Sequence, residues 1–160
     1  MGLDMYLSKK TYVQNWEHNP PEQHHQIEIK RGGVIRTDIK PNRICYITEQ
    51  VAYWRKFNAL HGWFIENCAA GVDECQDISV DEDKIKELLE TLKEVSSNFD
   101  KADELLPPTQ GFFFGSDEVD EYYKEEVNST IKIIEDLLEE HEQSKEYGLY
   151  SGEFEYRASW

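Results

Sequence analysis

The segment TEQVAYWRKFNALHGWFIENC, residues 48–68, places apolar, aromatic, basic and amide side chains within one helical repeat. At about 100° per residue, one group falls on a single stripe, as on a helix that packs against a core: Trp54, Phe57, His61, Phe64, Ile65 and Cys68. We therefore predict an amphipathic helix over residues 48–68, capped by the Thr48 hydroxyl. Lys56, Trp63 and Asn67 lie off the stripe, so we expect them to face a rim, a cleft or a partner.

Extended segments are predicted on both sides of this helix, chiefly because every second side chain is apolar. They are residues 3–13, 24–30, 34–38, 44–47, 78–80 and 149–160. The pair Gly32-Gly33 is typical of a tight hairpin turn between two of them. The last segment could pair with the first.

Two further amphipathic helices are predicted in the second half of the chain. The first begins at Asp81 and carries a periodic apolar stripe: Ile85, Leu88, Leu89, Leu92, Val95 and Phe99. Ser116 or Asp117 is expected to cap the other, which runs towards Gly148. The fold class is therefore α+β: a small, mainly antiparallel sheet packed on one face by about three amphipathic helices, in a single domain over residues 1–160.

The charge is strongly negative and unevenly distributed. The chain has a formal net charge of −16, and residues 81–146 hold 21 of its 33 acidic but only 7 of its 17 basic side chains, a net of −14. Such a surface repels nucleic acid and favours a partner protein with a basic surface, although it could equally serve as a solvated, solubilising face. The candidate partner-binding residues are Glu135, Asp136, Glu139 and Glu140.

A candidate small-ligand site lies on the first predicted helix and on the aromatic stretch of residues 111–115. Basic side chains can hold a phosphate, an amide can read a base edge, and aromatic rings can stack. The candidate ligand-binding residues are Tyr53, Arg55, Lys56, Asn58, His61, Trp63 and Phe113. The alternative is that they are ordinary core, rim and surface positions, with His61 a hydrogen-bonded core histidine.

A local basic patch stands out in this acidic chain. It consists of Lys30, Arg31, Arg36, Lys40 and Arg43. It could bind phosphate, or it could anchor the acidic helices of its own or of a second subunit. The alternative is ordinary surface charge on a hairpin.

Sequence motifs nominate neither an enzyme nor a cofactor or metal. No GxSxG, P-loop, HExxH, CxxC or dinucleotide fingerprint occurs. Cys45, Cys68 and Cys75 lack metal-type spacing, and we expect them to be reduced thiols. Because we find no long apolar run and no secretory signal, we expect a cytoplasmic protein that does not contact a membrane.

Three ordered blocks, MGLDMYLSKKTYV, YWRKFNALHGWF and LLPPTQGFFFGS, resemble a family of small, acidic, uncharacterised bacteriophage and prophage proteins. The resemblance covers most of the chain and implies a viral accessory protein acting in the cytoplasm of a bacterial host. It carries over no catalytic residue. Three functions stay open: an acidic inhibitor of a host defence or nucleic-acid-handling protein, a protein that binds or sequesters a nucleotide-like molecule, and a structural or assembly protein. The oligomeric state is open as well.

Overall fold

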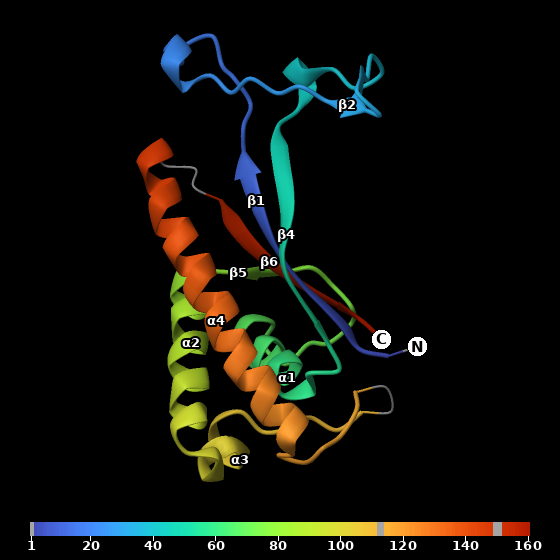
Figure 1. Ribbon diagram of the computed structural model, residues 1–160, viewed down its shortest axis with the longest axis vertical. Coiled ribbons are helices and arrows are strands. Elements are labelled where there is room, and N and C mark those ends of the chain that lie inside the picture. Colours follow the sequence, from blue (N-terminus) through green and yellow to red (C-terminus); the bar gives the residue numbers. More distant parts are fainter. Residues whose placement is uncertain (1, 112–113, 149–151) are drawn as a thin grey trace.

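The chain folds as an α+β protein, which confirms the predicted class (Figure 1). The computed structural model describes residues 2–111, 114–148 and 152–160. A four-stranded antiparallel sheet has the order β4-β1-β6-β5. Its strands are β1 (Asp4–Tyr12), β4 (Tyr46–Arg55), β5 (Ile78–Val80) and β6 (Glu153–Ser159). The helices are α1 (Asn58–Cys68), α2 (Glu82–Ser97), α3 (Ala102–Leu105) and α4 (Glu121–Ser144).

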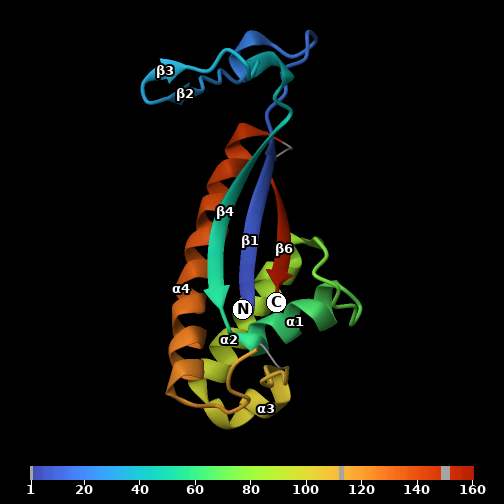
Figure 2. The same cartoon turned by 90° about the vertical axis from the view of Figure 1, so that its right-hand side faces the viewer.

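Strand β1 lies inside the sheet, with β4 on one side and β6 on the other. Met5 and Leu7 are fully buried on the face that the helices cover, whereas Tyr6 between them points to the opposite face. The register pairs Met5 with Trp54 and Leu7 with Tyr156, so large apolar side chains share the covered face. Figure 2 shows the long helices behind these strands, with both chain ends at the same end of the sheet. The predicted pairing of the first and last strands is confirmed.

The predicted helix over residues 48–68 is wrong in its first part. Residues Tyr46–Arg55 form strand β4, and Thr48 is an exposed strand residue instead of a helix cap. Lys56 then adopts a left-handed φ of 59°, and α1 begins at Asn58. The backbone of β4 finds its hydrogen-bond partners on β1, a strand more than thirty residues away, which local periodicity cannot reveal.

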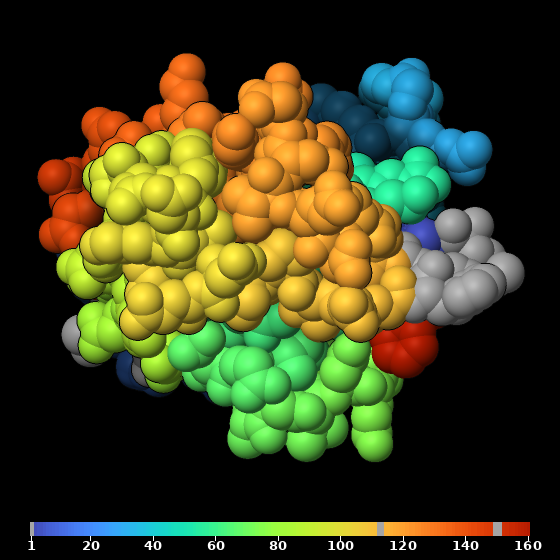
Figure 3. All heavy atoms as spheres, turned by 90° about the horizontal axis from the view of Figure 1, so that it is seen from below, coloured from blue at the N-terminus to red at the C-terminus, as the bar shows by residue number. Residues whose placement is uncertain are grey.

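The two long helices pack side by side against the sheet (Figure 1). The predicted stripe of α2 is confirmed for Ile85, Leu88, Leu92 and Val95, which are fully buried. Leu89 is half-buried, and Phe99 lies beyond the end of α2. Helix α4 begins later than the predicted caps, since the Asp120 carboxylate accepts the Tyr123 backbone N–H at 2.9 Å. At the end of the molecule seen in Figure 3, the green of α1, the yellow of α3 and the orange start of α4 form one continuous surface.

Residues 14–45, here called the arm, leave the sheet between β1 and β4 and extend beyond its end (Figures 1 and 2). The Val13 N–H donates to the Cys45 carbonyl at 2.9 Å and closes the base of the arm. The predicted turn at Gly32-Gly33 is confirmed by their φ values of 57° and 82°. The predicted strands on either side are reduced to β2 (Lys30–Arg31) and β3 (Val34–Ile35), because no wider sheet continues them.

Candidate functional site

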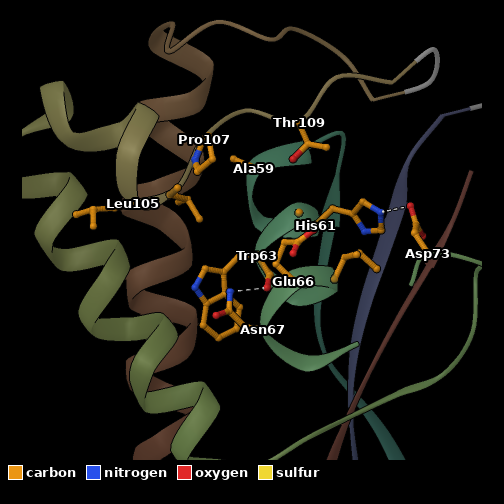
Figure 4. A pocket seen from close by; sticks show the side chains of 12 residues that line it. Ala59, His61, Trp63, Glu66, Asn67, Asp73, Leu105, Pro107 and Thr109 are labelled. Atoms are coloured by element: carbon orange, nitrogen blue, oxygen red, sulfur yellow. Dashed lines mark hydrogen bonds and ion pairs between the residues drawn. The ribbon is translucent and has the colours of Figure 1, made fainter. Parts of the chain in front are cut away.

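A cavity of about 200 Å³ lies between α1 and the segment that follows α3 (Figure 4). Trp63 and Asn67 line it from α1, and Leu105 and Pro107 line it from the other side. The loop after α1 adds Asp73, towards which His61 is turned. The site therefore combines an apolar wall with carboxylate and amide groups.

The polar centre of this cavity is a chain of hydrogen bonds through His61. Its Nε2 lies 3.0 Å from the Asp73 carboxylate, and its Nδ1 lies 2.8 Å from the Tyr156 hydroxyl. Because a carboxylate only accepts hydrogen bonds, the His61 Nε2–H donates to Asp73. Burial holds the pKa of Tyr156 well above its ordinary value, so this hydroxyl keeps its proton. Both ring nitrogens are satisfied, as the core-histidine interpretation of His61 requires.

Asn58 has a structural role in the first turn of α1. The side chain is buried, and its Nδ2 donates to the Phe114 carbonyl at 3.0 Å and to the Ser116 carbonyl at 2.7 Å. Its Oδ1 accepts the Thr109 N–H at 2.9 Å. These bonds occupy the amide and fasten the segment before α4, so Asn58 is not free to read a ligand.

The basic members of the predicted ligand set lie elsewhere. Tyr53 donates from its hydroxyl to Asp4 at 2.5 Å, and the Arg55 guanidinium lies 3.8 Å from the same carboxylate. Neither these residues nor the exposed Lys56 lines the cavity, whereas Trp63 does. Phe113 lies outside the described residues. The structure thus divides the predicted set, and the charged groups that line the cavity are carboxylates instead of cations.

Sequence reasoning missed half of the cavity wall. Glu66 lies in the last turn of α1 and Asp73 in the loop after it, and Leu105, at the end of α3, is followed by Pro107 and Thr109 in the next segment. Asp73, Pro107 and Thr109 lie in loops, which carry no periodic signal, so only the tertiary contact reveals that they share one cavity.

The second candidate surface is the acidic stripe of α4, defined as Glu135, Asp136, Glu139 and Glu140. All four side chains are exposed. Helix α4 as a whole contains eight acidic residues and only two lysines. Glu135 pairs with Lys93 of α2 at 2.6 Å, whereas no ion pair between described residues involves the other three. Within the stripe, Glu135 and Glu139 are four residues apart, as are Asp136 and Glu140, and like charges at this spacing destabilise a helix. Helix stability therefore does not explain it.

A polar cluster joins the start of α2 to the end of α4. Glu82 pairs with Lys86 at 2.7 Å and with Lys145 at 3.0 Å, and hydrogen bonds from both lower the pKa of its carboxyl to about 2. Its other oxygen lies 3.3 Å from Nε2 of the buried His141. Burial is the main cause that lowers the pKa of His141. These contacts fasten the two helices together.

The cysteines form no disulfide, and the metal-binding side chains form no cluster, within residues 2–111, 114–148 and 152–160. All three cysteines are free, and burial raises the pKa of the Cys68 thiol to about 11, which keeps it protonated near neutral pH. Within the same ranges no three His, Cys, Asp or Glu side chains could hold a metal ion, and no helix is long and apolar enough to cross a membrane.

No protein-family model matches this chain, and no curated protein or solved structure matches it either.

Proposed function

We propose that this protein is a non-enzymatic binding protein that engages a basic surface of another protein through the acidic stripe of α4. One observation supports this most directly. Exposed carboxylates gather on consecutive turns of α4, where like charges four residues apart repel each other, and three of them have no ion-pair partner among the described residues. A cationic partner surface would supply the missing counter-charges.

The resemblance to phage and prophage proteins suggests what the partner is. A viral accessory protein acts on host machinery, and proteins that handle nucleic acid carry basic surfaces that bind phosphates. A rigid helix with closely spaced carboxylates could occupy such a surface in place of nucleic acid. We therefore propose an inhibitor of a host defence or nucleic-acid-handling protein.

The test is capture of the partner from a bacterial lysate with the tagged protein at low and high salt, read by mass spectrometry. We expect one dominant host protein that is lost at high salt, because salt screens the attraction between the exposed carboxylates and a basic partner surface. The variant E135Q/D136N/E139Q/E140Q should weaken binding of that protein by about tenfold or more.

A matched control removes the same charge elsewhere. Asp83, Asp100, Asp103 and Glu104 are exposed, lie off α4 and form no ion pair among the described residues. Their neutralisation gives the same net charge and should leave binding nearly unchanged. Equal loss in both variants would show that bulk charge acts and not the stripe. Full binding by the stripe variant would refute the proposal.

The cavity beside α1 supports a second candidate function, the binding of a small ligand. Its apolar wall includes Trp63, and its charged lining consists of Glu66 and Asp73. These groups suit a small cationic or neutral aromatic molecule better than the phosphate of a nucleotide. A thermal shift with organic amines that is lost in Glu66→Gln and kept in Lys56→Ala would support this function. A shift with nucleotides alone would contradict it.

A further inference from the structure

The arm, residues 14–45, buries none of its own side chains. Three of its large apolar side chains are strongly exposed to solvent: Val34 is 72% exposed, Ile35 57% and Trp16 47%. Fixing a segment of this length costs conformational entropy, which burial of apolar surface normally offsets. An arm with such exposed apolar residues is therefore suited to be covered by another surface.

The arm is also the basic part of an acidic molecule. It holds four of the 33 acidic and five of the 17 basic side chains, a net of +1, so the rest of the chain has a net of −17. Lys30 pairs with Glu28, and Arg36 pairs with Asp38. The other three cations, Arg31, Lys40 and Arg43, form no ion pair with any described residue.

The basic arm and the acidic end of α4 lie towards the same end of the molecule but form no ion pair with each other within the described part of the chain. In Figures 1 and 2 the arm extends past the end of the sheet where α4 terminates. Among the described residues no hydrogen bond or ion pair joins the arm to α4. A basic arm and an acidic helix end that do not pair within one chain can pair with each other between two copies.

We propose that the arm of one copy docks on the acidic stripe of α4 of a second copy, in a reciprocal two-fold dimer. Each copy supplies one arm and one stripe, so the dimer makes the contact twice. Arg31, Lys40 and Arg43 face the unpaired carboxylates, and Val34 and Ile35 at the hairpin tip are covered by the partner. Single-stranded nucleic acid suits the arm less well, because the rest of the chain repels a polyanion and the tip is apolar.

This inference shares the acidic stripe with the proposed function but does not need its host partner. In the dimer the arm covers the stripe, so an outside partner must displace it. Dimer mass and partner capture are separate measurements, and each can fail while the other succeeds.

The experiment is light scattering coupled to size exclusion on the full chain at low and high salt. We expect the mass of a dimer at low salt and of a monomer at high salt. Two charge reversals, R31E/K40E/R43E on the arm and D136K/E139K/E140K on the stripe, should each weaken the dimer by about tenfold or more. When the two variants are mixed, one reversed arm meets one reversed stripe, and a mixed dimer should return.

Controls separate docking from misfolding and from bulk charge. Circular dichroism should be unchanged in the arm variant, because the arm buries none of its side chains. Reversal of the exposed cations Arg55, Lys101 and Arg157 makes the same charge change outside the arm and should leave the dimer intact. A monomer at low salt would overturn the proposal, as would a dimer that tolerates R31E/K40E/R43E. The proposal would also be overturned if the protein were a monomer and its arm bound single-stranded nucleic acid in a gel-shift assay.

Discussion

Asn58→Ala tests whether the first turn of α1 has the structural role that its contacts indicate. The side chain is buried and makes three hydrogen bonds to the backbone of the segment before α4, at 2.7–3.0 Å. Each bond contributes about 1 kcal/mol, and alanine also leaves its backbone partners without a protein partner. We expect the free energy of unfolding to fall by about 3 kcal/mol, which corresponds to a loss of about 6–12 °C in melting temperature for a chain of this size.

Urea unfolding gives the free energy, and hydrogen exchange of the Thr109 amide reports the local contact. That amide donates to Asn58 at 2.9 Å, so its exchange should accelerate in the variant. Asn67→Ala on the same helix is the control, because its exposed amide makes one bond to the Trp63 carbonyl at 2.9 Å. It should cost less than about 1 kcal/mol. Equal losses in the two variants, or a loss below about 1 kcal/mol for Asn58→Ala, would refute the structural role.

Three further predictions address other contacts. Glu82 has a pKa of about 2 against an ordinary 4.5, so it contributes stability above pH 4.5 that is lost as the pH falls towards 2. Its two lysine partners are solvent-exposed, so Glu82→Gln should cost only about 1–2 kcal/mol at pH 7 and almost nothing near pH 2. A cost that is independent of pH would contradict this. Gly62→Ala should destabilise by about 1–2 kcal/mol although alanine favours helix, because its Cβ would collide with the Thr109 hydroxyl. Addition of Thr109→Ala should restore stability in thermal melts, and no recovery would exclude this collision as the cause. Thr130→Val removes the hydroxyl that accepts the buried Trp54 indole N–H at 3.0 Å. The free energy of unfolding in urea should fall by about 1–3 kcal/mol. An unchanged free energy would show that this hydrogen bond is dispensable.

The sequence predicts burial better than it predicts conformation. Trp54, Phe57, His61 and Phe64 were expected on one buried stripe, and all four are buried. Their conformations differ, since Trp54 lies on β4 whereas His61 and Phe64 lie on α1. In a strand every second residue faces the core, and a short stretch of that pattern can coincide with a helical stripe.

The candidate site was predicted in part. His61 and Trp63 were nominated from the sequence, and both line the cavity beside α1. Arg55 and Lys56 were grouped with them by proximity in the chain, yet the left-handed turn at Lys56 leaves both outside the cavity. The opposite wall begins at Leu105, about forty residues further along, so sequence spacing gave no indication of it.

The sequence by itself determined the α+β class, the long amphipathic helices and the concentration of negative charge after residue 80. These properties follow from composition and from the period of apolar side chains, which are local. Only the tertiary structure decided that residues 46–55 form a strand, that the cavity has an acidic lining and that the arm leaves its apolar residues open. Each of these depends on which distant backbone or side chain lies opposite, and contacts between distant segments are formed only when the chain is folded.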